Sequence, residues 1–320
     1  MSDQEKIVFV IFSTRYLGKA PNGSLLRLGK VLSLLDSANL QYRIVSPGKL
    51  LLRPFGFTKS LTVFVGYRHT MLINIVGLFR ASIWFDAVDS FMLAQNEINR
   101  SLFRFLVAAL RNRIRPKKEL FLLTHISKLD SFFDQNQFNY ANRFIFPNLL
   151  PKIPVNTNET LRPVFVGHGR YIPNQKAVEF LSTLPLIRDM GGLRVVGGQY
   201  PKKLIRKLQH CVNFMGIVED EKLYFNNDVH FAPILSKAGI KNKVAIPLSL
   251  GLRVITTHEG ANGLKVSPNL ALMEDLDAIS RLTVSDITQI KVRNTNLNVF
   301  EADDSKEIVK LLETFNSQNE

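Results

Sequence analysis

The hydrophobic residues of this chain fall into short runs that alternate with longer stretches in which apolar positions recur at helical spacing. A short apolar run bounded by polar residues indicates a buried strand, and apolar residues three or four positions apart indicate a helix. In the first half, these patterns predict strands at residues 7–12, 42–45, 61–65, 81–85 and 120–123, and helices at 23–35 and 96–113. Strands that alternate with helices are typical of parallel sheets in α/β proteins.

A proline-rich segment, residues 146–154, interrupts this pattern and is followed by the polar run Asn-Thr-Asn-Glu-Thr. Such a composition is typical of a linker. The alternation then resumes, with strands predicted at 162–166, 193–196, 212–215, 229–232 and 253–256 and helices beginning near 174, 202 and 241. We therefore expect two doubly wound, Rossmann-like α/β domains, residues 1–154 and 155–320. Ligands bind such domains at the carboxyl ends of the strands, so a cleft between the two is the expected site.

Three ordered segments of the second domain carry most of the information on function. Residues 164–178 contain Gly167, Arg170 and Lys176, residues 212–229 contain Gly-Ile-Val-Glu-Asp, and residues 232–264 contain Ala-Gly-Ile-Lys-Asn-Lys. In order and spacing they resemble the retaining glycosyltransferases of family 4, the glycosyl transferases group 1, whose GT-B fold has two facing Rossmann-like domains. The resemblance implies a nucleotide-diphosphate sugar as donor, and neither a metal ion nor another cofactor.

The resemblance also suggests how the donor is held. In that family an Arg and a Lys six residues later reach the diphosphate, and Arg170 and Lys176 have that spacing. A helix opening after 238–240 would point backbone N–H groups at the phosphates. Cations placed there stabilise the charge that grows on the departing diphosphate. The donor-binding residues expected in the second domain are Gly167, Arg170, Lys176, Ala238, Gly239, Ile240 and Lys243.

The first domain offers fewer candidates. Gly23 follows the first strand, where the resembling enzymes place a glycine-containing loop beneath the sugars. Asp86 follows a predicted strand and is the best candidate for orienting or deprotonating an acceptor hydroxyl. The alternative role for Asp86 is to cap the following turn. With Arg170 and Lys176, it completes the predicted catalytic set.

The sequence departs from the family at a pair of glutamates, of which the second binds the ribose of the donor in many members. The corresponding positions are Ala238 and Ile246. An apolar side chain cannot accept a ribose hydroxyl, and loss of a hydrogen bond to a charged group costs about 1.5–3 kcal/mol. Three interpretations remain open: Glu259 replaces the missing carboxylate, the donor is unusual, or the site has degenerated.

The formal net charge of +14 is concentrated in the first half, where 20 Lys and Arg oppose 9 Asp and Glu in residues 1–150. Such a field favours an anionic partner, although solubility alone also explains it. Two basic segments with apolar neighbours suggest an anionic membrane surface. Their cations are Lys49, Arg53, Arg111, Arg113, Arg115, Lys117 and Lys118. Alternatively, residues 102–118 form a core helix whose cationic end complements the helix dipole.

These features favour an enzyme that transfers a sugar to a glycan or a lipid-linked acceptor in polysaccharide or glycoconjugate synthesis. No apolar run reaches the length of a membrane span. We expect the protein to be cytoplasmic, because a single cysteine suits a reducing compartment, and peripheral on the inner face of the membrane, because of the basic segments. One alternative is a non-catalytic GT-B subunit that binds a partner glycosyltransferase or a glycan. Another is a transferase that modifies nucleic acid, although the chain has no recognised nucleic-acid motif. The single cysteine, Cys211, excludes an internal disulfide.

Overall fold

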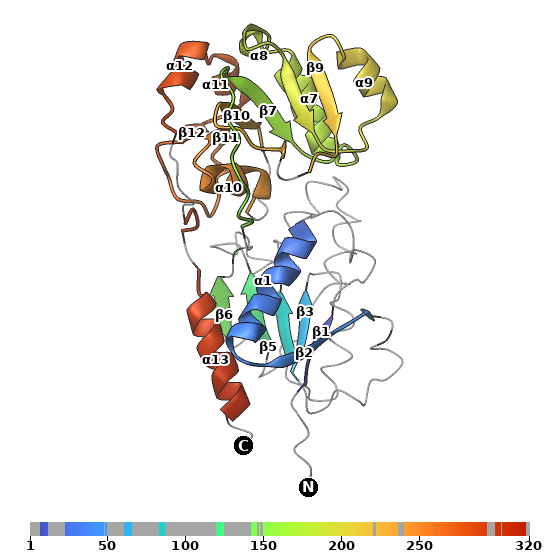
Figure 1. Ribbon diagram of the computed structural model, residues 1–320, viewed down its shortest axis with the longest axis vertical. Coiled ribbons are helices and arrows are strands. Elements are labelled where there is room, and N and C mark those ends of the chain that lie inside the picture. Colours follow the sequence, from blue (N-terminus) through green and yellow to red (C-terminus); the bar gives the residue numbers. More distant parts are fainter. Residues whose placement is uncertain are drawn as a thin grey trace, which may run out of the picture. The chain divides into compact units, whose positions relative to one another are not determined.

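The computed structural model of the protein describes residues 7–11, 23–47, 49, 61–65, 83–86, 120–124, 142–145, 147 and 150–317, the last range except 220–221, 236–239, 293–297 and 302. Contacts divide the chain into two compact units. The first unit consists of Met1–Leu149 with Glu301–Glu320, and the second of Leu150–Phe300. Figure 1 shows a parallel sheet in each of them.

The first unit contains a sheet of six described strands in the order β2-β1-β3-β4-β5-β6, with every pair parallel. The strands are β1 (Ile7–Ile11), β2 (Gln41–Val45), β3 (Thr62–Val65), β4 (Ile83–Asp86), β5 (Leu120–Thr124) and β6 (Asn142–Ile145). Helix α1 (Gly23–Ser37) follows β1. The predicted strands of this half are confirmed, whereas β6 was missed because it opens on Asn142 and Arg143. The predicted helix over 96–113 lies outside the described residues.

Apolar side chains of α1 pack on the strands at the centre of this sheet. Leu28, Val31 and Leu35 share one face of the helix, and all are buried against Val10 of β1 and Val63 of β3. A 3.6-residue repeat brings positions i, i+3 and i+7 onto the same side, so the spacing that predicted the helix also supplies its contact with the sheet.

Helix α13 (Ser305–Ser317) also belongs to the first unit. Ile308 and Leu312 lie one turn apart on the helix, are fully buried, and join the cluster formed by α1, β1 and β3. The expected second domain ran to residue 320, and here the structure differs: the second unit ends at Phe300. The apolar stripe of α13 was visible in the sequence, but a stripe does not reveal which sheet will cover it.

The second unit contains a sheet in the order β12-β11-β10-β7-β8-β9, and all of its strand pairs are parallel. Its strands are β7 (Arg162–Val166), β8 (Leu193–Val196), β9 (Val212–Gly216), β10 (Asp228–Ala232), β11 (Arg253–Thr257) and β12 (Leu270–Met273). Its helices are α7 (Ile172–Ser182), α8 (Pro185–Asp189), α9 (Lys202–Leu208), α10 (Asn242–Ser249), α11 (Leu276–Ser280) and α12 (Val284–Gln289). The five predicted strands are confirmed.

Helices cover both faces of this second sheet. On one face, Phe165 and Phe231 pack against Val178 of α7 and Leu208 of α9. On the other face, the apolar side of α10 packs on β10 and β11. Strands of a parallel sheet are buried on both sides, as in β10, where every residue is buried, Asp228 and His230 included. The parallel α/β architecture of both units confirms the predicted fold class.

Within the described part of the chain, no helix combines the length and the apolar character that crossing a bilayer requires.

We predict that Leu312→Ala destabilises the first unit, because it removes a fully buried side chain from the cluster beneath α1. Large-to-small substitutions of this kind cost about 2–5 kcal/mol. Amide hydrogen exchange should show faster exchange in α1 and unchanged exchange in α7. Lys310→Ala, an exposed position on the same helix, is the matched control. Unchanged protection of α1 in the Leu312 variant would contradict the assignment of α13 to this unit.

Candidate functional site

The order of the strands in the second sheet creates a switch point beside β7. From β7 the chain adds β8 and then β9 on one side, and it returns to place β10 on the other side of β7. The connections that leave the carboxyl ends of β7 and β10 therefore run to opposite faces of the sheet. Ligands of open α/β sheets bind where such a reversal occurs.

Glycine-containing turns follow β7, β8 and β9 at this edge and are joined by backbone hydrogen bonds. Gly169 N–H donates to Gly198 O at 2.9 Å, and Gly197 N–H donates to Gly216 O at 2.8 Å. Gly197 has a φ of 135°, and a Cβ there would lie 1.9 Å from the carbonyl oxygen of Gly167. Because only glycine permits this conformation and this approach, the three turns form one close-packed edge.

Side chains hold the turn between β7 and α7 in place. Asn174 Nδ2 donates to His168 O at 2.9 Å, and Gln175 Nε2 donates to Gly169 O at 2.6 Å. The Tyr200 hydroxyl donates to Gly167 O at 3.1 Å. Burial raises the pKa of Tyr200, so its hydroxyl keeps the proton that it donates. With these carbonyl oxygens bonded by the protein itself, the turn is fixed before any ligand arrives.

Lys243 of α10 reaches this turn from the opposite side of the switch point. Its Nζ donates a hydrogen bond to Asn174 Oδ1 and lies 4.8 Å from the centre of the Phe165 ring. Burial, aided by the nearby charge of Lys241, lowers the pKa of Lys243 to about 8. Both contacts of the ammonium are uncharged groups, so neither neutralises it. The arrangement provides a fixed, partly desolvated cation, which is suited to an anionic ligand.

Ile240 anchors the segment that leads into α10. Its side chain is 7% exposed and packs with Val244 and Ala261, and its terminal carbons lie close to Gly263. Gly263 has a φ of 77°, which favours glycine. Ile240 was predicted as a donor-binding residue, and the structure shows its side chain as packing, whereas any contribution of its backbone stays a prediction. Ala238 and Gly239 lie outside the described residues.

The other predicted donor residues lie at the surface or nearby. Arg170 and Lys176 are exposed, in the turn before α7 and on the helix itself, and Gly167 begins the turn. The described side-chain hydrogen bond to Asn174 of α7, which itself bonds to the turn, comes from Lys243 and not from either of them. Glu259 is half-buried in the turn that follows β11. The roles of these residues in binding stay predictions.

In the first unit, only the backbone is described for two candidates. Gly23 begins α1, and Asp86 ends β4 at the carboxyl edge of the first sheet. Among the predicted membrane-contacting cations, Lys49 is described and is exposed. The others, Arg53, Arg111, Arg113, Arg115, Lys117 and Lys118, lie outside the described residues.

Two features of the site were not predicted. Asn174, which links α7 to α10, is a buried polar residue, and its signal in the sequence was only the Pro-Asn pair at the start of α7. Exposed apolar side chains also occur in segments that follow β7, β9 and β10: Ile172 is 63% exposed, Ile217 75% and Leu235 64%. Exposed apolar groups next to fixed polar ones are typical of surfaces that bind ligands or partners.

Ile246, expected from the sequence to stand at the position of the family's second glutamate, has a packing role in the structure. It lies on α10 and packs, partly buried, against the cluster that contains Val196, Leu223 and Leu252. This position therefore contributes to the packing of α10 on the sheet.

The chain also contains an Asp-x-Asp sequence, Asp275-Leu276-Asp277. Asp275 Oδ1 accepts a hydrogen bond from the backbone N–H of Ala278 at 2.7 Å, which caps the start of α11. This interaction gives Asp275 a structural role of the kind expected of an N-cap residue.

Comparison with known proteins agrees with this geometry. Residues 162–282 match the model of the family described as Glycosyl transferases group 1. No curated protein sequence matches the chain.

Solved structures resemble the chain in fold. A putative UDP-N-acetylglucosamine 2-epimerase from Listeria monocytogenes is 8% identical, with a TM-score of 0.55 and coverage of 99% of this chain and 98% of that one. The UDP-GlcNAc 2-epimerase of Methanocaldococcus jannaschii is 9% identical, with a TM-score of 0.54 and coverage of 97% and 99%. TarM is 11% identical, with a TM-score of 0.50, and the match covers 85% of this chain but only 53% of TarM.

The fold is that of GT-B proteins, and residues 162–282 of the second unit match the glycosyl transferases group 1 model. The resemblance seen in the sequence is therefore confirmed.

We predict that the amine of Lys243 titrates near pH 8, below its ordinary value of 10.5, because burial disfavours the charged form. Pulse labelling with an amine-reactive reagent across pH 6.5–11, read by mass spectrometry, should give a reactivity midpoint near pH 8. The unfolded chain binds this proton more tightly, so deprotonation of Lys243 should favour folding as pH rises from about 8 to 10.5. A midpoint at or above 10 would show that the ammonium is not desolvated.

Proposed function

We propose that this protein is a glycosyltransferase that moves a sugar from a nucleotide-diphosphate donor to a glycan or a lipid-linked acceptor. The observation that carries the proposal is Lys243, a half-buried, partly desolvated cation held at the switch point by uncharged contacts. A diphosphate placed there supplies the missing counter-charge. The family match over residues 162–282 supports sugar transfer as the reaction class.

The proposed chemistry uses the charge that forms on the leaving group. An acceptor hydroxyl attacks the anomeric carbon, the bond from that carbon to the β-phosphate oxygen breaks, and a nucleoside diphosphate leaves with the bonding electrons. The hydroxyl proton passes to the leaving oxygen, to the carboxylate of Asp86 or to solvent. Lys243, with Arg170 and Lys176 as the proposed flanking cations, stabilises the departing diphosphate more strongly than the intact donor. These cations take the place of a metal ion, and retention at the anomeric carbon follows by analogy with the family.

Asp86 is proposed to act on the acceptor side, where its carboxylate orients the acceptor hydroxyl or accepts its proton. The surplus of positive charge in the first half supports an anionic or membrane-bound acceptor. We propose that the protein works in polysaccharide or glycoconjugate synthesis on the cytoplasmic surface of a membrane.

The structural neighbours suggest which donors to test first. The M. jannaschii 2-epimerase was solved with UDP-GlcNAc and UDP, so UDP-sugars lead the panel. Fold alone does not separate an epimerase from a transferase, because both use GT-B architecture. The family match favours transfer, and incubation with UDP-GlcNAc separates the two: an epimerase changes the sugar of the donor without any acceptor present.

We predict that one class of nucleoside diphosphate raises the melting temperature of the protein. A ligand that binds only the folded state at 100 times its dissociation constant stabilises that state by about 2.7 kcal/mol. Lys243→Gln should weaken the binding by roughly 10- to 100-fold, because it removes a hydrogen bond between charged groups. Isothermal titration calorimetry gives the dissociation constants. Lys265→Gln, an exposed position in the same unit, is the matched control and should bind normally.

Two further variants sharpen this test. Lys243→Arg keeps the charge and should retain most of the affinity at pH 9, where the unliganded wild-type Lys243 is largely neutral. Arg170→Ala should weaken nucleotide binding without changing the melting temperature of the unliganded protein, because its side chain is exposed.

Chelation of divalent metal should leave binding and transfer unchanged. Equal affinity in the Lys243→Gln variant and the wild type would rule out Lys243 as the diphosphate ligand.

A second candidate function is a GT-B subunit that does not catalyse transfer and instead binds a partner glycosyltransferase or a glycan. Ile246 favours it, because packing against the sheet replaces the carboxylate that many members use for the ribose. Absence of any thermal shift with nucleotides or nucleotide sugars at millimolar concentration would support this alternative.

A further inference from the structure

A second cleft lies at the opposite end of the second sheet, beside the amino ends of β7, β8 and β9. It encloses about 1200 Å³ and is bounded by the start of these strands, by the turns that precede β8 and β9, and by the segment that leads to β10. Its basic lining residues are Arg162, Arg188, Arg194, His210 and Lys222. The cleft also extends along β9 to Met215 and Val218, but its lining includes neither Asn174 nor Lys243 nor any residue of the turn after β7, so it is distinct from the candidate donor site.

The described lining of this cleft is basic. Four Arg and Lys side chains and one His line it, and its described lining includes no Asp or Glu. An acidic residue nearby, Glu219, pairs with Lys222 at 2.7 Å, and both side chains are more than 70% exposed. Exposed pairs of this kind contribute little energy, so an incoming anion can replace Glu219 at small cost.

Two of the arginines are fixed by one buried carboxylate. Arg162 donates to Asp228 Oδ1 through Nε at 3.1 Å and Nη2 at 2.9 Å, and Arg194 Nη1 lies 3.7 Å from Asp228 Oδ2. Asp228 is fully buried. Burial raises its pKa, and the two arginines oppose that change. One carboxylate balances one guanidinium, so the pair retains a surplus positive charge.

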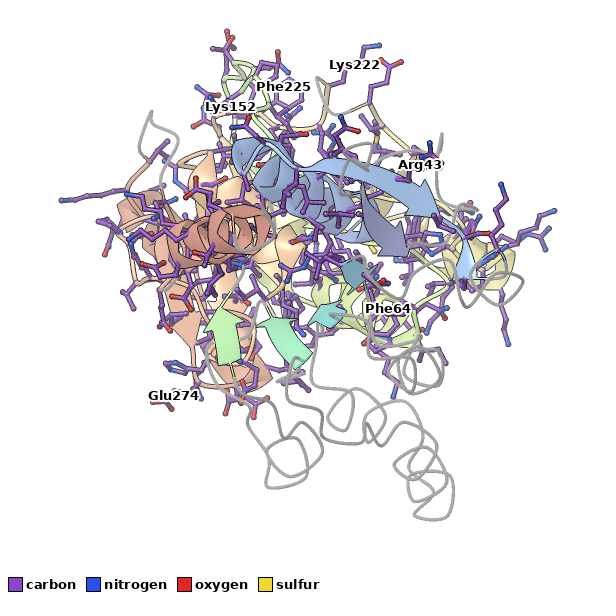
Figure 2. All side chains as sticks on the ribbon, turned by 90° about the horizontal axis from the view of Figure 1, so that it is seen from below. Arg43, Phe64, Lys152, Lys222, Phe225 and Glu274 are labelled. Carbon is purple, nitrogen blue, oxygen red and sulfur yellow. The ribbon has the colours of Figure 1, made fainter. Side chains whose placement is uncertain are left out.

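Phe225 orders the same two guanidinium groups. Their central carbons lie 4.2 Å (Arg162) and 5.3 Å (Arg194) from the centre of its ring. Arg194 Nη2 also donates to the backbone carbonyl of Lys222 at 3.2 Å, whereas its buried Nη1 has the ion pair but no hydrogen-bond acceptor. Figure 2 shows Phe225 and Lys222 at the same edge of the second unit. The arginines are thus held in position before a ligand binds, while Arg162, with a side chain 33% exposed, remains reachable.

We infer that this cleft is a second anion site, which binds a phosphorylated ligand. The planar donor fork of arginine matches the oxygens of a phosphate group, and the exposed cations Arg188 and Lys222 line the same cleft and can bind the same group. The volume exceeds that of a single phosphate, and Met190, Ile205 and Phe214 also line the cleft. These residues suit a ligand in which a phosphate is attached to a less polar body. The inference does not rest on the proposed transferase activity.

The test uses pyrophosphate as the probe, in full-length protein that carries Lys243→Gln to weaken the candidate donor site. Calorimetry at constant ionic strength should show one saturable site. Arg188→Gln with Lys222→Gln should weaken that site by at least about tenfold, because two charged hydrogen-bond donors are lost. Both positions are exposed, so folding should be unaffected.

The matched control is Lys202→Gln with Lys203→Gln, which removes the same charge from exposed positions of α9 outside the cleft. The control should change the affinity by less than about twofold, the size expected of a screened, distant charge. Equal weakening in both double variants would overturn the proposal, since the effect would then be one of net charge. Absence of saturable pyrophosphate binding would overturn it as well. Neither result would depend on whether nucleotide sugars bind at the switch point.

Co-sedimentation with vesicles of phosphatidylglycerol and phosphatidylcholine identifies the source of the phosphate. If the cleft variant loses pyrophosphate affinity but sediments like the wild type, the ligand is a soluble phosphorylated molecule. If it loses both while the control loses neither, the cleft binds phosphate groups displayed on a membrane. Vesicle binding by a protein that does not bind pyrophosphate would contradict a built phosphate site.

Discussion

The return of the chain from β9 to β10 is the constraint on which the second unit depends. Because β10 pairs with β7 rather than with β9, α7 and α10 cover opposite faces of the sheet. A hydrogen bond from Lys243 to Asn174 connects the two helices. If β10 instead followed β9 in the sheet, α7 and α10 would lie on the same face, separated by other helices. Lys243 would then not lie next to the turn after β7.

Hydrogen bonds hold the groups around Lys243 in place, and its contacts with described residues include no counter-charge. Carbonyl oxygens in the turn are bonded by Asn174, Gln175 and Tyr200, and the glycine turns are joined by backbone hydrogen bonds. Electrostatic stabilisation is most effective when the groups that provide it need not reorganise. Partial removal of the Lys243 ammonium from water costs the folded protein free energy, and the lowered pKa of Lys243 shows this cost.

Much of the fold could be predicted from the sequence, because strand cores and amphipathic helices depend on local spacing. Strand β1 is a short, continuous apolar run, and α1 shows its buried face in the positions of Leu28, Val31 and Leu35. Strand β6 was missed because it begins with polar residues. The apolar face of α13 could pack on either sheet, so its sequence does not reveal the unit to which it belongs. The pairing of Lys243 with Asn174, and of Asp228 with two arginines, joins residues far apart in sequence. Local patterns do not show which distant residues form contacts. The sequence therefore predicted the site residues that lie in motifs, but not the contacts between them.

The packing of α13 on the first unit means that the second unit is inserted into the first along the chain. Two crossings, at residues 149–150 and 300–301, therefore connect the units. A ribosome completes Leu150–Phe300 before it makes α13, whose Ile308 and Leu312 fill the core of the first unit. Since domains fold as units during synthesis, the second unit can reach its native structure while the first still lacks part of its core. The order of folding would then be the reverse of the order in which the two units begin to be made.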